Sequence, residues 1–277
     1  GFPAPYGNAG KTESQGFEID LNLNKDIGDF HVWGRIYASH NTNKVIFRDD
    51  APLMPDYQKN AGYPIGQQRS VINSGVFYQN WDEIFASVPY ENYDNEKQPG
   101  YYDLVDFNGD GLINANDNAP VGFSEVPQNT ANVSVGTDYK GWSFMIQFYG
   151  VNNASRIMTL NNFRSDSDVL FEHVRDYWSK DNPDASSYLP RWMANRGNLG
   201  DFYLWDASYL KLRSVELAYN FKTSGELSNR GISNMRLYLQ GNDLFFWSEM
   251  PDSRESGGSN GAYPLLKRVH LGVEISF

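Results

Sequence analysis

Apolar and polar residues alternate along seven stretches of the chain. Between Phe17 and Leu23, for example, every odd-numbered residue is apolar and every even-numbered residue is polar. Because successive side chains of a β-strand point to opposite faces, each stretch is predicted to be a half-buried strand. The predicted strands lie near residues 11–24, 29–40, 130–139, 141–151, 205–221, 232–247 and 267–277.

The fifth predicted strand contains a break in the alternation. Leu210 and Leu212 are apolar at even positions, whereas Val215 and Leu217 are apolar at odd positions. One extra residue in a strand reverses the faces of all the residues that follow it. The break therefore predicts a β-bulge near Ser214.

Short and long connections alternate strictly between the predicted strands. The short ones are near residues 24–28, 138–141 and 222–231, and the long ones near 41–129, 152–203 and 248–266. In an antiparallel meander, alternate connections lie at opposite ends of the sheet, so all the long loops share one end. This sorting is typical of outer-membrane β-barrels and is unusual for a β-sandwich.

The predicted strand count also favours a barrel segment. Bacterial outer-membrane barrels have an even number of strands, and the alternation predicts seven. The chain ends on an aromatic residue, Phe277, inside the last predicted strand. We therefore expect the C-terminal part of a larger barrel. One helix is predicted within a long loop, at residues 167–178.

Composition narrows the possible functions. The 277 residues carry 23 Lys and Arg and 34 Asp and Glu, a formal net charge of −11, which argues against nucleic-acid binding. Aromatic residues make up 15% of the chain, so disorder is excluded. The chain has no Cys, and no stretch approaches the ~18 consecutive apolar residues of a membrane-spanning helix.

Residues 106–117, with the sequence DFNGDGLINAND, match a twelve-residue calcium loop. Such loops supply oxygen ligands at positions 1, 3, 5, 7, 9 and 12 and need Gly at position 6 for a sharp turn, which is Gly111 here. The candidate ligands are the side chains of Asp106, Asn108 and Asp110, the carbonyl of Leu112, and the side chains of Asn114 and Asp117.

The calcium loop would have a structural role. Pro99-Gly100 precedes it and Pro120 follows it, so the helix pair of a signalling EF-hand is missing. A bound ion would restrict the conformations of a long loop. The alternative is an Asn- and Gly-rich turn that holds no ion.

Several motifs, in order and spread over essentially the whole chain, resemble the C-terminal part of SusC/RagA-type TonB-dependent outer-membrane transporters of Bacteroidetes. Residues 9–18 resemble the "GKxExxGFE" segment of that family, and residues 106–117 resemble its "DxNGDGxI" loop, which Pro120-Val121-Gly122 follows. Residues 209–219 resemble "YLRLKNVxLGY", residues 237–245 resemble "RVYxxGxNLF", and residues 263–265 contain its "YP" element.

This resemblance implies a 22-stranded antiparallel barrel in the outer membrane, of which residues 1–277 would form about seven strands without the N-terminal plug. It implies TonB-dependent import of a large nutrient, a glycan or a peptide, with a SusD-like lipoprotein as partner. Membrane lipid would surround the barrel, and TonB would act through the missing N-terminal region.

Substrate contacts are expected in the long loops, where aromatic rings can stack on sugars or pack against peptides. The candidates are Tyr177, Trp178, Trp192, Tyr203 and Trp205. Catalysis is not expected, because the four His have no metal-ligand spacing and no nucleophile or phosphate-binding motif is present. The alternative function is a soluble extracellular β-sandwich that binds carbohydrate and is braced by calcium.

Overall fold

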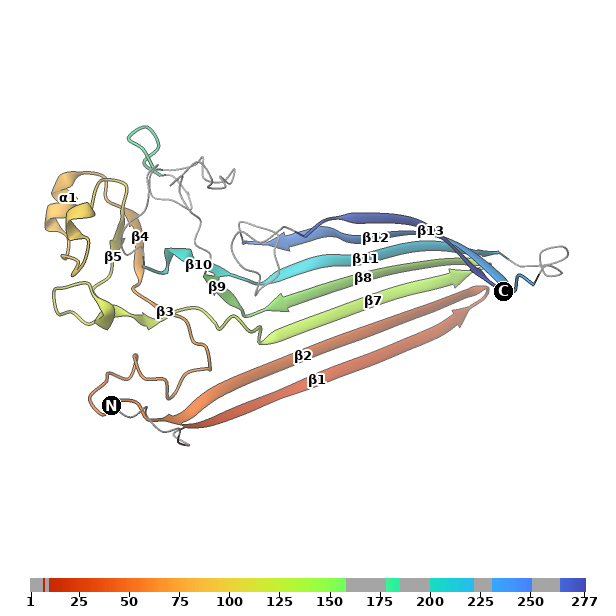
Figure 1. Ribbon diagram of the computed structural model, residues 1–277, viewed down its shortest axis with the longest axis horizontal. Coiled ribbons are helices and arrows are strands. Elements are labelled where there is room, and N and C mark those ends of the chain that lie inside the picture. The colour runs from red at the N-terminus through yellow and green to blue at the C-terminus, as the bar shows by residue number, and fades with distance from the viewer. Residues whose placement is uncertain (1–6, 8–9, 158–177, 185–199, 222–230, 251–264) are drawn as a thin grey trace, which may run out of the picture.

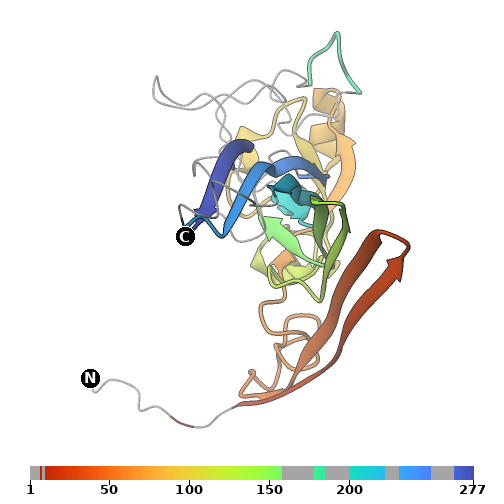
Figure 2. The ribbon, with the colours of Figure 1, turned by 90° about the vertical axis from the view of Figure 1, so that its right-hand side faces the viewer.

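The computed structural model describes residues 7, 10–157, 178–184, 200–221, 231–250 and 265–277. Its main feature is one antiparallel sheet of seven strands, which follow one another in chain order (Figure 1). Viewed along the strands, they form a curved wall rather than a flat layer (Figure 2). The strands are β1 (Gly10–Ile27), β2 (Phe30–Arg48), β7 (Asn129–Tyr139), β8 (Trp142–Asn152), β11 (Tyr209–Phe221), β12 (Asn234–Ser248) and β13 (Arg268–Ser276).

The register places like residues side by side across all seven strands. One row is apolar from edge to edge: Leu23, Gly34, Val135, Ile146, Val215, Gly241 and Val269. The neighbouring row, on the opposite face, is polar from edge to edge: Asn22, Arg35, Ser134, Gln147, Ser214, Asn242 and Arg268. The alternation in the sequence thus becomes one apolar face and one polar face of the sheet.

The predicted bulge is confirmed. Leu212 pairs with Phe148 on the apolar face, and Ser214 pairs with Gln147, the next residue of β8, on the polar face. Arg213 is the extra residue, so the parity of the apolar positions reverses there. The irregularity continues into β12, where two residues lie between the partners of Leu212 and Ser214.

Tight turns lie at one end of the sheet. β7 and β8 are joined by Lys140 and Gly141, which both have positive φ, as a type I′ hairpin requires. β1 and β2 are joined at Gly28, with φ of 62°. The described residues of the long connections lie at the opposite end (Figure 1).

The long connection between β2 and β7 folds into a small unit of its own. It contains β3 (Arg69–Ser70), β4 (Asn73–Phe77), α1 (Trp81–Ala86), η1 (Asp94–Glu96), β5 (Tyr102–Leu104), η2 (Ala115–Asp117) and β6 (Ala119–Pro120). β3 pairs with β6 and β4 pairs with β5. A buried cluster of Val71, Tyr90, Leu104 and Ile113 holds the unit together.

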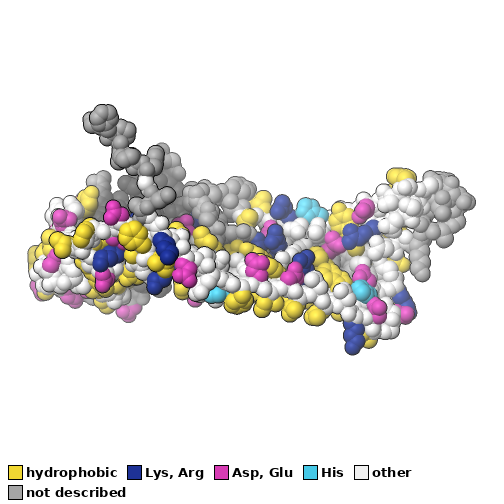
Figure 3. Space-filling model, turned by 90° about the horizontal axis from the view of Figure 1, so that it is seen from below, with side chains coloured by type: hydrophobic (Ala, Val, Ile, Leu, Met, Phe, Trp, Pro, Cys, Tyr) yellow, Lys and Arg dark blue, Asp and Glu magenta, His cyan; other side chains and the backbone are white. Residues whose placement is uncertain are grey.

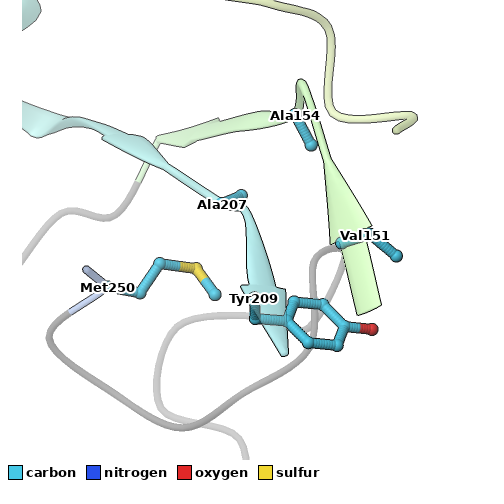
Figure 4. Close-up of a cluster of buried hydrophobic side chains, with 5 residues drawn as sticks. All are labelled: Val151, Ala154, Ala207, Tyr209 and Met250. Carbon is cyan, nitrogen blue, oxygen red and sulfur yellow. The ribbon is translucent and has the colours of Figure 1, made fainter. Parts of the chain in front are cut away.

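A second buried cluster lies where the sheet meets its loops. It consists of Val151, Ala154, Ala207, Tyr209 and Met250 (Figure 4). β9 (Ser155–Ile157) and β10 (Leu204–Asp206) form a short pair beside it, and η4 (Gly200–Tyr203) leads into β10.

The predicted fold class is confirmed, while several boundaries differ. β2 runs to Arg48 rather than ending near residue 40, and β11 begins at Tyr209, with β10 as a separate strand before it. The predicted loop helix at residues 167–178 lies outside the described residues, apart from Trp178. Outside the main sheet, the described residues form only two-stranded sheets and isolated bridges, so they do not supply the second large sheet of a β-sandwich.

No helix among the described residues is long and apolar enough to cross a membrane.

Candidate functional site

The two faces of the sheet differ sharply in chemistry. Large apolar side chains of the apolar face are exposed on every strand, among them Phe17, Leu23, Val135, Phe144, Leu217, Leu239 and Leu271. Ion pairs lie on the polar face, including Arg35 with Asp20 at 2.7 Å and Arg236 with Glu216. Seen from below, the sheet shows a run of hydrophobic side chains beside charged ones (Figure 3).

In the predicted calcium loop, carboxylates accept hydrogen bonds from the loop backbone. The Asp106 carboxylate accepts from Gly109 N–H at 2.8 Å and from Gly111 N–H at 2.7 Å. Gly109 and Gly111 have φ of 74° and 84°, a region that favours glycine. These bonds fold the first half of the loop into a tight turn around Asp106.

The second half of the loop is organised by Asp117, which is fully buried. Its carboxylate accepts from the backbone N–H of Phe107 at 2.9 Å, of Asn108 at 3.3 Å and of Asn114 at 2.8 Å. With the Asn114 side chain it forms a capping box at the start of η2. Asp117 therefore ties the two ends of the loop together.

The carboxylates of this loop do not form an assembled cation site. Among the described residues, no group of three or more His, Asp or Glu side chains is gathered closely enough to hold a metal ion. The carboxylates of Asp106 and Asp117 are directed at backbone N–H groups. In this structure the two carboxylates close the loop through hydrogen bonds and do not form a metal centre. Calcium binding stays a prediction.

A buried lysine braces the neighbouring segment. Lys97 is only 3% exposed. Its ammonium group donates to Ser87 Oγ at 3.0 Å and to the Val88 carbonyl at 2.7 Å. Its Nζ lies 2.8 Å from Asp94 Oδ1 and 3.8 Å from the centre of the Tyr90 ring. The segment from residue 87 to residue 97 is thereby held in one conformation.

Asp94 gives this brace a predictable pH dependence. The Lys97 ammonium, followed by the Tyr90 N–H, lowers the pKa of the Asp94 carboxyl below its usual value. A carboxyl with a depressed folded-state pKa stabilises the fold above its unfolded pKa, near ~4, and loses that contribution as the pH falls through the folded-state value. We expect amide exchange in residues 87–97, corrected for intrinsic rate, to be constant from pH 7 to 5 and to accelerate below pH ~4. Asp94→Asn should remove that acceleration, and an unchanged pH profile in this variant would contradict the assignment.

Next to this brace lies a pocket of 500 Å³ that the sequence did not predict. It is lined by Tyr90, Glu91, Asn92, Tyr93, Ile113, Asn114, Ala115 and Asn118, and we call it the Tyr93 pocket. Its two walls are joined by hydrogen bonds from Glu91 N–H to the Ile113 carbonyl and from Ile113 N–H to the Pro89 carbonyl, both at 2.9 Å. The only sequence signal was a tyrosine flanked by Asn and Asp at residues 92–94.

The three predicted substrate aromatics that the structure describes, Trp178, Tyr203 and Trp205, lie in different surroundings. Trp178 is 7% exposed, lies against Gly100, and donates from Nε1 to Gln79 Oε1 at 3.1 Å. Trp205 packs against the buried cluster at the base of the loops, and Tyr203 contacts Phe202. Tyr177 and Trp192 lie outside the described residues. A role of these five in substrate binding stays a prediction.

No family model matches the chain. Over its whole length, the chain is 26% identical to TonB-dependent receptor P26 of Formosa agariphila and 23% identical to TonB-dependent receptor P3 of the same organism. The chain spans 30% of the length of each of these curated relatives.

Solved structures have the same fold. A structure of the RagAB peptide transporter matches the whole chain with a TM-score of 0.68 at 19% identity, and the match spans 30% of that transporter chain. The RagAB peptide importer in its closed-closed state matches with a TM-score of 0.66 at 18% identity, over 31% of its length. The predicted resemblance is confirmed, and so is the outer-membrane location that these proteins share. The chain is thus a relative of the TonB-dependent receptors along its whole length, and its seven-stranded sheet has the fold of the RagAB barrel wall.

Proposed function

We propose that the chain forms part of the barrel wall of a TonB-dependent transporter that imports a large nutrient, a glycan or a peptide, across the outer membrane. The observation that carries this proposal is the two-faced sheet, with rows that are wholly apolar or wholly polar across seven strands. The apolar face meets lipid and the polar face lines the lumen, as in known outer-membrane barrels.

The loop ends give the barrel its direction. Outer-membrane barrels have short turns in the periplasm and long loops outside the cell. The hairpin turns at Gly28 and Lys140-Gly141 are then periplasmic, and the unit between β2 and β7 is extracellular. A SusD-like lipoprotein would close this extracellular mouth, and the TonB system would supply energy. These partners are proposed from the likeness to the RagAB transporter and to TonB-dependent receptors.

A binding and transport role accounts for the described residues better than catalysis. Relatives of the chain are named receptors and transporters. The ion pairs of the polar face, such as Lys211 with Asp243 at 3.5 Å, link neighbouring strands and would line the lumen.

The test combines location with energy coupling. In the source organism, an antibody against residues 10–48 should detect the protein in the outer-membrane fraction, and the band should shift on boiling, as folded barrels do. Deletion of the gene should abolish growth on one complex nutrient, and deletion of tonB should abolish the same growth. Detection in the aqueous fraction, or uptake that persists without TonB, would contradict the proposal.

A further inference from the structure

Tyr93 adopts a backbone conformation that bulky residues rarely take. Its φ of 64° and ψ of 21° lie in the left-handed region. Residues persist there only when the surrounding structure fixes them, and such positions concentrate at binding sites. The brace around Lys97 supplies that constraint, because Asp94 accepts from both Tyr90 N–H and Lys97 Nζ.

The constraint holds an aromatic ring out of the core. The Tyr93 residue is 56% exposed, although the same segment buries Tyr90 in the cluster beneath it. Burial raises the pKa of Tyr90, so its hydroxyl stays protonated and donates to the Tyr102 carbonyl at 3.0 Å. The two tyrosines therefore differ in role: Tyr90 anchors the segment, and Tyr93 presents a ring beside the pocket.

Several polar side chains around the Tyr93 pocket have hydrogen-bonding groups that no other described residue uses. The side chains of Glu91, Asn92 and Asn118 make no hydrogen bond to another described residue. Asn114 uses its Oδ1 to accept from Asn116 N–H at 2.7 Å, which leaves its amide NH₂ group as a donor. Donors and acceptors thus surround an apolar floor formed by Tyr90 and Ile113.

The charge of the pocket selects against anionic ligands. None of its described lining residues is Lys, Arg or His, and Glu91 adds a carboxylate. Lys97 is directed away into the brace behind Tyr90. A phosphate, sulfate or acidic peptide would therefore meet no compensating cation in these walls.

The backbone of the pocket walls also disfavours an extended peptide. Peptides commonly bind by adding a strand to a free backbone edge. Here the N–H of Glu91 and the carbonyl and N–H of Ile113 bond the walls to each other or to Pro89. The free groups are side-chain amides, a carboxylate and an exposed aromatic ring, which match the hydroxyls and the apolar face of a sugar.

We infer that the Tyr93 pocket binds a neutral sugar unit of a glycan on the extracellular side of the barrel. The Tyr93 ring stacks on the sugar face, and Asn92, Asn114 and Asn118 hydrogen-bond its hydroxyls. This inference rests on the proposed function and gives its nutrient a chemical class. The volume of 500 Å³ falls within the range of small-molecule sites.

The test uses the full transporter purified in detergent. Neutral hexasaccharides with β-1,4-glucan, β-1,3-glucan, mannan, xylan and agarose backbones are titrated by calorimetry, together with neutral and acidic peptides of similar mass. We expect at least one neutral hexasaccharide to bind and Tyr93→Gly to weaken it at least tenfold. Glycine adopts the left-handed conformation without strain, so this variant keeps the loop while it removes the ring.

Two further variants separate stacking from folding. Tyr93→Phe keeps the ring and should bind within about threefold of wild type. Trp81→Ala removes a similarly exposed aromatic residue on α1, outside the pocket, and should leave binding unchanged. Absence of binding to all five hexasaccharides, or binding that Tyr93→Gly does not alter, would overturn the inference, as would peptide binding that depends on Tyr93.

Failure of the inference is distinguishable from failure of the proposed function. If TonB-dependent uptake persists while no hexasaccharide binds, only the sugar assignment is wrong. If the protein is absent from the outer membrane, or if nutrient uptake does not depend on TonB, the transport proposal fails whatever the pocket binds.

Discussion

Arginine in place of Ile146 is expected to destabilise the barrel by ~2–4 kcal/mol, the cost of a cation on the lipid face near the bilayer midplane. Ile146 lies midway along β8, between Val135 and Val215 in the wholly apolar row. Its replacement would place a guanidinium among side chains that offer it no hydrogen-bond acceptor. The free energy of unfolding is measured by guanidinium denaturation of the full transporter folded in lipid vesicles.

The matched control is Gln147→Arg, one residue further along the same strand. Gln147 faces the polar side, where it donates to Asn132 Oδ1 at 3.0 Å. Loss of that bond should cost about 1 kcal/mol, and the new cation would remain in water. Equal destabilisation by the two arginines would contradict the assignment of the faces.

Alanine in place of Asp117 is expected to unfold the loop of residues 106–118 locally. Its buried carboxylate accepts three backbone N–H groups, and each buried donor left without a partner costs ~1–3 kcal/mol. Hydrogen exchange of the Phe107 and Asn114 amides should accelerate by at least two orders of magnitude, the equivalent of about 3 kcal/mol. Asp110→Ala is the control, because this exposed carboxylate accepts one backbone N–H, that of Leu112, and should have a much smaller effect.

The same measurement tests the calcium prediction. If the loop binds calcium, millimolar Ca²⁺ should slow exchange across residues 106–117 in the wild type, because an ion that binds only the folded loop stabilises it. Asp106→Asn should weaken this effect. Exchange that does not respond to Ca²⁺ in either protein would show that the loop is closed by its own hydrogen bonds alone.

The sheet could be predicted because its two faces meet different surroundings. The period of two fixes both the strands and their faces. The parity break between Leu212 and Val215 predicts a bulge near Ser214, and the extra residue in the structure is its neighbour Arg213. The upper part of β2, beyond His40, was missed because its Asn, Thr and Lys residues do not alternate. Backbone pairing with β1 carries that extension, and the sequence pattern does not record backbone pairing.

The loop sites were harder to predict, since they depend on contacts between distant residues. The calcium motif is contiguous and was recognised, but the sequence did not show that its carboxylates close the loop on backbone N–H groups. The Tyr93 pocket joins segments about twenty residues apart through the hydrogen bonds of Ile113. The aromatic ring of Trp178 makes it a candidate for substrate binding, but its burial against Gly100 depends on a tertiary contact that the sequence does not reveal.

The separation of an apolar row and a polar row onto opposite faces of the sheet also has a consequence for evolution. If the chain forms part of a transporter barrel, neighbouring residues of one strand are under separate selective pressures: Ile146 from the bilayer, and Gln147 from the cargo on the opposite face. The hydrogen bonds that join neighbouring strands are made by the backbone and do not depend on either side chain. In such a barrel, mutations that suit a new cargo would accumulate on the polar face while the lipid-facing residues stay unchanged.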